Sequence, residues 1–207
     1  MGAPPDEAEL IERSRRGDLE AFNAIVAAYQ DQVYNLCLRM LGSRQPAEDV
    51  AQEAFLSAFR SLGRMRGPTV RAWLLRIAAN GCIDEIRRQR RQPQLSLDAS
   101  PDDKEPGRRL DAPDPAVGPE QMVLRSELRD ALRSELLRLP MDQRLAVVLC
   151  DVEGLSYEEI AATMGSSVGT VKSRISRGRT RLREGVRARG ELFGDLVRLS
   201  SSNPRGE

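Results

Sequence analysis

Residues 155–183 read LSYEEIAATMGSSVGTVKSRISRGRTRLR, and this stretch predicts two short helices joined by a tight turn. Ser156 and Glu159 have the S-x-x-E spacing of a capping box, which starts a helix at the next residue. Gly165 ends that helix, because glycine accepts the positive φ of a helix C-terminus. Either of the two serines that follow can cap the second helix.

The second helix has an apolar stripe on one side and polar side chains on the other. At about 100° per residue, the stripe consists of Val168, Val171, Ile175 and Leu182. The opposite face consists of Thr170, Ser173, Ser176, Arg177, Thr180 and Arg181. Short hydroxyl side chains let a helix lie close to a DNA groove, and arginine can bind a guanine edge. Lys172, Arg174 and Arg179 lie on either side of this face, where they can contact phosphates. The pattern predicts a helix-turn-helix that reads the major groove of DNA.

The alternative is an ordinary helical hairpin with a solvated basic face. Between Val168 and Arg189 there are eight lysines and arginines against one glutamate. This excess of positive charge favours a polyanionic partner over the plain hairpin.

The composition predicts helical domains and argues against several classes of protein. The 207 residues suffice for two small domains, and the low aromatic content of 4% indicates aliphatic cores. Histidine, the commonest general base and metal ligand, is absent. Cys37, Cys82 and Cys150 are odd in number and widely spaced, which indicates no disulfide framework. We therefore expect no metal and no cofactor. No segment resembles a signal peptide or a membrane span, so we expect a soluble, cytoplasmic protein without membrane insertion.

The N-terminal half predicts successive helices. Residues 7–16 form a short one, and Asp18 caps a longer one that ends at Gly42. The next helix, residues 43–62, has an acidic outer face with Leu56 inside it; the polar members of this face are Asp49, Gln52, Glu53 and Arg60. A leucine within an acidic face suggests a docking surface for a basic partner. A solvated face with one stray leucine explains the pattern equally well.

A basic loop and a long helix follow. The loop, residues 63–68, contains Arg64 and Arg66, and the helix starts at Thr69. Its end has four arginines in five residues: Arg87, Arg88, Arg90 and Arg91. Cations suit a helix C-terminus, but this cluster exceeds that need and indicates a polyanion. Arg76 and Asn80 lie one turn apart on the same helix; the amide suits a base edge, although buried structural asparagines are common.

Residues 93–119 predict a linker. Between Gln92 and Glu120 lie six of the twelve prolines and seven acidic residues against three basic ones. Such a segment does not bury enough surface to fold alone. It is either an inert tether or an acidic strand that mimics nucleic acid in a basic channel. Helices resume at residues 120–139 and, after Pro140, at residues 142–152; beyond residue 189 the pattern allows another amphipathic turn or two.

Two separate blocks resemble one family. PAEDVAQEAFLSAF, followed by RAWLLRIAANGCIDEIRRQRR, is similar to region 2 of bacterial sigma-70 family factors. LPMDQRLAVVLCDVEGLSYEEIAATMGSSVGTVKSRISRGRTRLRE is similar to their region 4. With a linker and no region 3 domain between them, the chain resembles the extracytoplasmic-function (ECF) class. The resemblance implies an all-α fold with a region 2 domain (1–92), a linker (93–119), a region 4 helix-turn-helix domain (120–189) and an unassigned tail (190–207).

The resemblance also implies roles for residues. Docking on the β′ clamp helices of core RNA polymerase would fall on Asp49, Gln52, Glu53 and Leu56. Recognition and melting of the −10 element would fall on Arg64, Arg66, Arg76, Asn80, Arg87 and Arg88. Base contacts with the −35 element would be made by Lys172, Ser173, Ser176 and Arg177. Phosphate contacts would be made by Ser156, Tyr157, Thr170, Arg174 and Arg179. Ser176 stands where several relatives have a larger side chain, so their −35 preference does not transfer.

The resulting expectation is a specificity subunit rather than an enzyme. Its partners would be core polymerase, through the β′ clamp helices and the β flap, promoter DNA and an anti-sigma factor. One alternative is an autonomous helix-turn-helix regulator, which would need no region 2 block and usually has a sensor or receiver domain. A second alternative, a nucleic-acid enzyme, is disfavoured by the lack of histidine and of a carboxylate cluster.

Overall fold

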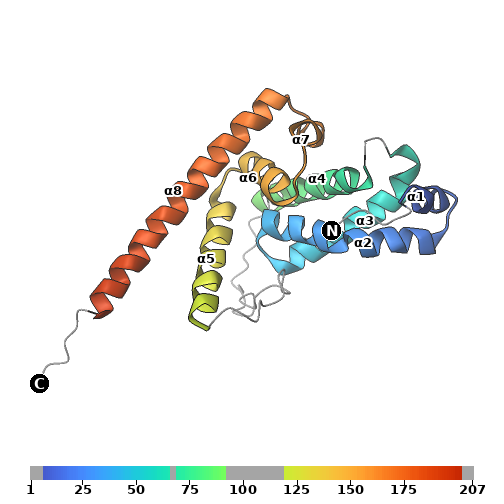
Figure 1. The fold of residues 1–207 in the computed structure, drawn as a ribbon. Helices are drawn as coiled ribbons and strands as arrows, with labels where there is room; N and C mark the ends of the chain where they lie inside the picture. Colours follow the sequence, from blue (N-terminus) through green and yellow to red (C-terminus); the bar gives the residue numbers. More distant parts are fainter. Residues whose placement is uncertain (1–6, 66–68, 92–118, 202–207) are drawn as a thin grey trace, which may run out of the picture.

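The computed structural model describes residues 7–65, 69–91 and 119–201, with the backbone alone for residues 119–127 and 190–201. All regular elements in these ranges are helices (Figure 1). The N-terminal group consists of α1 (Glu7–Arg15), α2 (Leu19–Leu41), α3 (Arg44–Ser61), the 3-10 turn η1 (Leu62–Arg64) and α4 (Val70–Arg91). The C-terminal group consists of α5 (Pro119–Arg138), α6 (Met141–Val147), the π-helical turn η3 (Val148–Val152), α7 (Tyr157–Met164) and α8 (Val168–Ser201).

In the N-terminal group, α2, α3 and α4 pack on one another and capping residues define where the helices begin and end. Asp18 accepts hydrogen bonds from the backbone N–H groups of Glu20 and Ala21 at 3.0 and 3.1 Å, which confirms the predicted cap of α2. Gly42 ends α2 with a φ of 78°. Glu7 of α1 accepts a hydrogen bond from the backbone N–H of Val70 at 3.2 Å. This last contact ties α1 to the start of α4, the helix with the candidate −10 residues.

In the C-terminal group, α8 lies against α6 and α7, and α5 contacts the middle of α8, at Gly185 and Arg189 (Figure 1). Val171 and Ile175 of α8 are buried at 0% and 2% exposure, so the predicted apolar stripe faces inward. At Gly178 the helices approach so closely that a Cβ would lie 2.6 Å from Cγ2 of Val147 and 3.3 Å from the carbonyl oxygen of Gln143. Glycine therefore sets the distance between α8 and α6.

The two groups share one continuous apolar core, and three arginines form polar contacts between them. Arg133 of α5 donates to the Gly42 carbonyl at 2.7 Å, and Arg144 of α6 donates to the Met40 carbonyl. Arg71 of α4 donates to the carbonyl oxygen of Glu153. Two of these acceptors lie at the C-terminal end of α2, in its last turn at Met40 and at its cap Gly42, where carbonyls have no partner within the helix. This close packing was not part of the sequence-based expectation, because the contacts join residues far apart in the chain.

Two elements differ from the predicted pattern. The helix expected at residues 142–152 is α6 followed by the π-helical turn η3, so its last turn is wider than an α-turn. Beyond residue 189, where the sequence allowed another amphipathic turn or two, the chain continues α8, which spans 34 residues from Val168 to Ser201. The linker 93–119, apart from Pro119 at the start of α5, and Arg66 lie outside the described residues.

Candidate nucleic-acid and polymerase interface

The helix-turn-helix forms as its local sequence predicts. The Ser156 hydroxyl accepts from the backbone N–H of Glu159 at 3.2 Å, and the Glu159 carboxylate accepts from the backbone N–H of Ser156 at 2.8 Å. Gly165 has a φ of 58°. Of the two candidate serines, Ser167 is the cap of α8: its hydroxyl accepts from the backbone N–H of Thr170 at 3.1 Å. The capping box and the turn are therefore confirmed.

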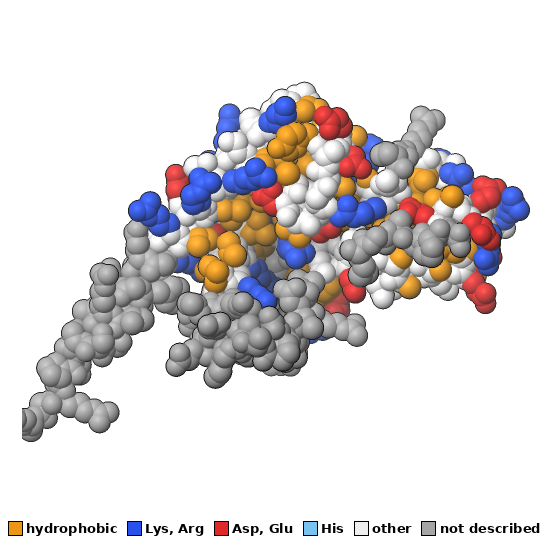
Figure 2. Space-filling model, viewed as in Figure 1, with side chains coloured by type: hydrophobic (Ala, Val, Ile, Leu, Met, Phe, Trp, Pro, Cys, Tyr) orange, Lys and Arg blue, Asp and Glu red, His pale blue; other side chains and the backbone are white. Residues whose placement is uncertain are grey.

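The outer face of α8 is open. Lys172, Ser176 and Arg177 are exposed, whereas Ser173 is half-buried and donates to the Thr170 carbonyl at 2.9 Å. Basic side chains follow the described length of α8 in Figure 2. The arrangement is that of a recognition helix whose cations and short hydroxyls are presented together.

Several cations of α8 contact side chains from other elements, including three candidate DNA-contact residues. The Lys172 Nζ lies 5.6 Å from the centroid of the Tyr157 ring. The Arg174 Nε donates to Asp142 at 2.9 Å, and the Arg179 Nε donates to Asp151 at 3.0 Å.

Neither aspartate was predicted from the sequence as a partner of α8. They lie 32 and 28 residues from their arginines, on α6 and η3, and α7 separates these elements from α8 in the sequence.

The Asp151–Arg179 pair has a marked electrostatic effect. The hydrogen bond from Arg179 lowers the pKa of Asp151 below its ordinary value, against the opposing effect of burial. The same hydrogen bond raises the pKa of Arg179. Both groups therefore stay charged at neutral pH, and the arginine remains a cation within the interface.

The candidate −10 residues of α4 lie on an accessible surface. Arg76 and Asn80 are exposed, so the alternative of a buried structural asparagine is wrong. Arg88 forms two hydrogen bonds with Glu85, at 2.7 and 2.9 Å, and Arg87 lies 3.5 Å from Asp84. Arg64 of η1, Arg90 and Arg91 are also exposed. The helix end keeps a positive surface, although acids one turn earlier offset part of its charge.

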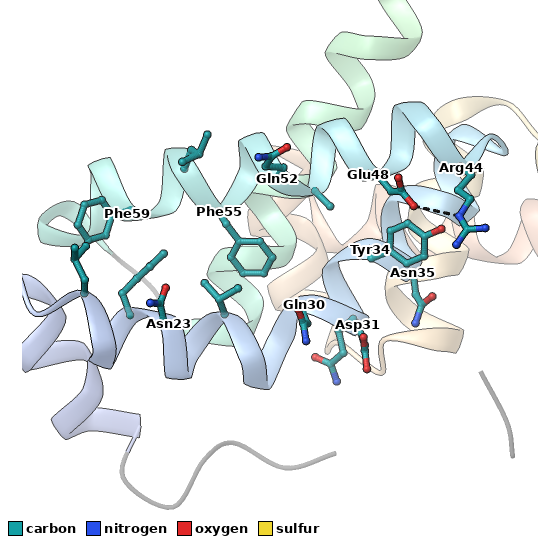
Figure 3. Close-up of a pocket in the computed structure, with 16 residues that line it drawn as sticks. Asn23, Gln30, Asp31, Tyr34, Asn35, Arg44, Glu48, Gln52, Phe55 and Phe59 are labelled. Atoms are coloured by element: carbon teal, nitrogen blue, oxygen red, sulfur yellow. Dashed lines mark hydrogen bonds and ion pairs between the residues drawn. The ribbon is translucent and has the colours of Figure 1, made fainter. Parts of the chain in front are cut away.

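The acidic face of α3 borders a groove that the sequence did not predict. Asp49, Gln52 and Glu53 are exposed, and Leu56 is 45% exposed. The groove lies between α2 and α3, has a volume of about 1170 Å³ and includes Gln52 and Leu56 in its wall (Figure 3). Leu19, 60% exposed, and Phe59, 37% exposed, extend its apolar surface. The part of the groove wall formed by α2 was not predicted, because the sequence pattern of this helix indicated that its apolar residues were buried in a core.

Other kinds of site find no support in the described part of the chain. No group of three or more His, Cys, Asp or Glu side chains is arranged to hold a metal ion there. Among those residues no helix is both long and apolar enough to cross a membrane.

A helix-turn-helix with an exposed basic recognition helix defines a DNA-binding protein, and comparison with known proteins gives the family. The sigma-70 region 2 model matches residues 25–92, and the sigma-70 region 4 model matches residues 129–182. The chain is 42% identical over 173 residues to the ECF RNA polymerase sigma-E factor of Escherichia coli K12, covering 82% of this chain and 88% of that protein. The chain therefore belongs to the ECF class of RNA polymerase sigma factors.

Two further comparisons agree with this assignment. The chain is 43% identical over 166 residues to the ECF RNA polymerase sigma factor SigE of Mycolicibacterium smegmatis; the match covers 80% of this chain and 62% of that protein. A solved structure of the sigma factor RpoE with the anti-sigma factor NepR from Bartonella quintana is similar with a TM-score of 0.61 and 25% identity. That match covers 80% of this chain and 96% of the solved chain.

Proposed function

We propose that this chain binds core RNA polymerase and directs it to promoters with defined −35 and −10 elements. The observation that carries the proposal is the presence, in one chain, of an exposed recognition helix and exposed region 2 surfaces on α3 and α4. An autonomous regulator would need only the helix-turn-helix. Membership of a sigma factor family therefore favours a specificity subunit, which acts by binding rather than by catalysis, over both alternatives.

At the −35 element, α8 enters the major groove. The base-reading residues are Lys172, Ser173, Ser176 and Arg177. The phosphate contacts are Ser156, Tyr157, Thr170, Arg174 and Arg179. Arg177 is the one with a fork that matches a guanine edge, so it contributes most to sequence preference.

At the −10 element, α4 holds unpaired DNA. Asn80 and Arg76 are exposed one turn apart, so an extruded base and its backbone can be bound together. Arg87 and Arg88 bind phosphates of the separated strand, and Arg64 of η1 and Arg66, which lies outside the described residues, assist them. Opening of the duplex then follows from binding the melted form more tightly than the paired form.

Core polymerase docks on the groove between α2 and α3. The β′ clamp helices would bring basic side chains to Asp49, Gln52 and Glu53, and apolar ones to Leu56 and the groove. The β flap would bind the C-terminal group. The NepR complex of a similar sigma factor suggests an anti-sigma factor as a further partner. Because both polymerase and promoters are in the cytoplasm, we propose that the protein acts there.

Binding to both elements requires the two groups of helices to separate. In the packed structure Asn80 and Ser156 lie at most about 35 Å apart. This limit follows from the Arg71–Glu153 contact, the rise per residue along α4 and the length of chain from Glu153 to Ser156. Elements centred about 25 base pairs apart are separated by about 85 Å of duplex. The 27 residues between α4 and α5 can span at most about 90 Å, which is long enough.

The proposal is tested by mixing the pure protein with core polymerase and measuring complex formation and DNA binding. We expect a one-to-one complex with core and no tight, sequence-specific binding to duplex DNA by the protein alone. Tight binding of a palindromic duplex without polymerase, together with no complex with core, would favour the autonomous regulator.

A further inference from the structure

Three arginines of α8 are candidate DNA contacts, and they fall into two groups. Arg174 and Arg179 are each paired with a carboxylate from a preceding element, Asp142 of α6 and Asp151 of η3. Arg177 lies between them in sequence, is exposed and forms no hydrogen bond or ion pair with any described residue. The paired arginines are the candidate phosphate contacts, and the unpaired one is the candidate base contact.

The Asp151–Arg179 pair leaves one side of the guanidinium available. The Arg179 Nε donates to Oδ2 of Asp151 at 3.0 Å, and Nη2 donates to Oδ1 of the same carboxylate. The Arg179 Nη2 also donates to Sγ of Cys150 at 3.6 Å. A guanidinium has five N–H groups, so these contacts leave the two hydrogens of Nη1 free. The Arg179 side chain is 46% exposed. The free edge can therefore bind a phosphate oxygen while the opposite edge stays on Asp151.

Asp142 holds Arg174 in a similar way. The Arg174 Nε donates to Asp142 at 2.9 Å, and neither terminal nitrogen is needed for this bond. The Arg174 side chain is 26% exposed and the Asp142 side chain 43%, so the pair lies at the edge of the interface. Both terminal nitrogens remain available to a ligand.

We propose that Asp151 and Asp142 are positioning residues for DNA binding: each holds a phosphate-binding arginine in its bound conformation before the DNA arrives. The inference rests on the proposed role of α8 at the −35 element. A free arginine loses side-chain freedom when it binds, and a held arginine has already lost it. The unpaired Arg177 keeps its freedom, which suits a side chain that must adjust to a base edge.

Two simpler explanations give opposite expectations. If the aspartates only join helices, their replacement changes stability and leaves the salt dependence of DNA binding as it was. If they only reduce the positive charge of the surface, their replacement strengthens binding to every DNA, because one negative charge is removed. If the aspartates position the arginines, their replacement weakens DNA binding in spite of the gain in positive charge.

The experiment measures promoter affinity of the holoenzyme against salt concentration for the wild type and Asp151→Asn. The probe is the duplex that the wild-type holoenzyme selects from a library randomised at the −35 element. We expect Asp151→Asn to weaken binding about three- to fivefold and to reduce the salt slope by about one. Tighter binding, or an unchanged slope, would overturn the inference.

A double-mutant cycle and a matched control sharpen the result. In an Arg179→Ala background, Asp151→Asn should cause no further loss, because the residue it positions is gone. Glu158→Gln on α7 makes the same change of charge at an exposed residue and should leave binding unchanged or tighter.

Two other outcomes remain interpretable. If Asp151→Asn lowers the unfolding temperature sharply, the same binding experiment is done with Asp142→Asn. Its effect on promoter affinity is then compared with and without Arg174→Ala, which decides the same question. If the wild-type holoenzyme selects no −35 sequence at all, the proposed function of α8 fails, whatever the variants do.

Discussion

Arg71 in the first turn of α4 donates hydrogen bonds to both the backbone carbonyl and the carboxylate of Glu153, the residue after η3. Glu153 is 5% exposed and the Arg71 side chain 28%, so this polar contact is partly buried between the N-terminal and C-terminal groups. Burial raises the pKa of Glu153, and the nearby Arg39 and Arg71 offset only part of the effect. A buried carboxylate of this kind costs desolvation, which suits a contact that must break when the two groups separate.

The Glu153 pKa shift predicts how packing depends on pH. A carboxyl with a raised pKa in the packed state stabilises that state below its ordinary pKa of 4.5, and this contribution is lost as pH rises through the raised value. Glu153→Gln mimics the protonated form, so we expect its unfolding temperature at pH 7 to exceed that of the wild type by about 2 °C or more. The difference should vanish toward pH 4. A variant less stable than the wild type at pH 7 would show that the ion pair with Arg71 outweighs burial.

Gly178→Ala should destabilise the C-terminal group. The added Cβ would lie 2.6 Å from Val147 and 3.3 Å from the Gln143 carbonyl, so α8 and α6 must move apart. We expect a cost of about 1–3 kcal/mol in the free energy of unfolding, despite the better helix propensity of alanine. Gly169→Ala, on the same helix, meets only the Ser167 hydroxyl at 3.8 Å and should be neutral or stabilising. Equal effects of the two changes in a denaturant titration would refute the packing argument.

Arg177→Ala should change sequence preference. Loss of a two-point contact with a guanine should cost about 1–3 kcal/mol at one −35 base and little elsewhere. Holoenzyme affinity for a series of single-base substitutions measures this directly. Arg174→Ala is the comparison, because loss of a phosphate contact weakens all sequences to a similar extent. If Arg177→Ala behaved in that uniform way, Arg177 would be another phosphate contact.

Asp49→Arg should weaken binding to core polymerase. Asp49 is exposed on α3, so the fold should tolerate the change while the docking face loses its charge complementarity. We expect at least about a tenfold rise in the dissociation constant for core, on the order of 1.4 kcal/mol. Glu9→Arg makes the same charge change on α1, outside the groove residues, and should have little effect. Unchanged holoenzyme assembly by Asp49→Arg would remove α3 from the docking surface.

Local signals predicted the helix-turn-helix because they act within one turn of helix. The Ser156–Glu159 capping box and the positive φ of Gly165 depend on neighbours three or four residues away, so their spacing is visible in the sequence. The exposed face of α8 follows from the same periodicity. The resemblance to region 2 similarly placed Asn80 and Arg76 on one accessible side of α4.

Local sequence signals did not predict the contacts between helices. Asp142 and Asp151 become partners of α8 only because Gly178 brings α8 onto α6, and no spacing rule encodes that approach. The sequence allowed further helical turns beyond residue 189 but did not show that they continue α8 without a break to Ser201. A glycine lowers helix stability by only about 1 kcal/mol and does not by itself end a helix. The sequence did not predict that Leu19 forms part of the groove wall. An apolar residue in an amphipathic helix is predicted to be buried, and only the packing of neighbouring helices shows that it is exposed.

Run-off transcription with purified core polymerase, this protein and a library of randomised promoters is the decisive measurement for the proposed function. We expect the protein to make transcription start at templates that share two elements at a fixed separation, and duplexes lacking either element to give no product. Transcripts that show no enrichment of sequence, or the same products with core polymerase alone, would contradict it.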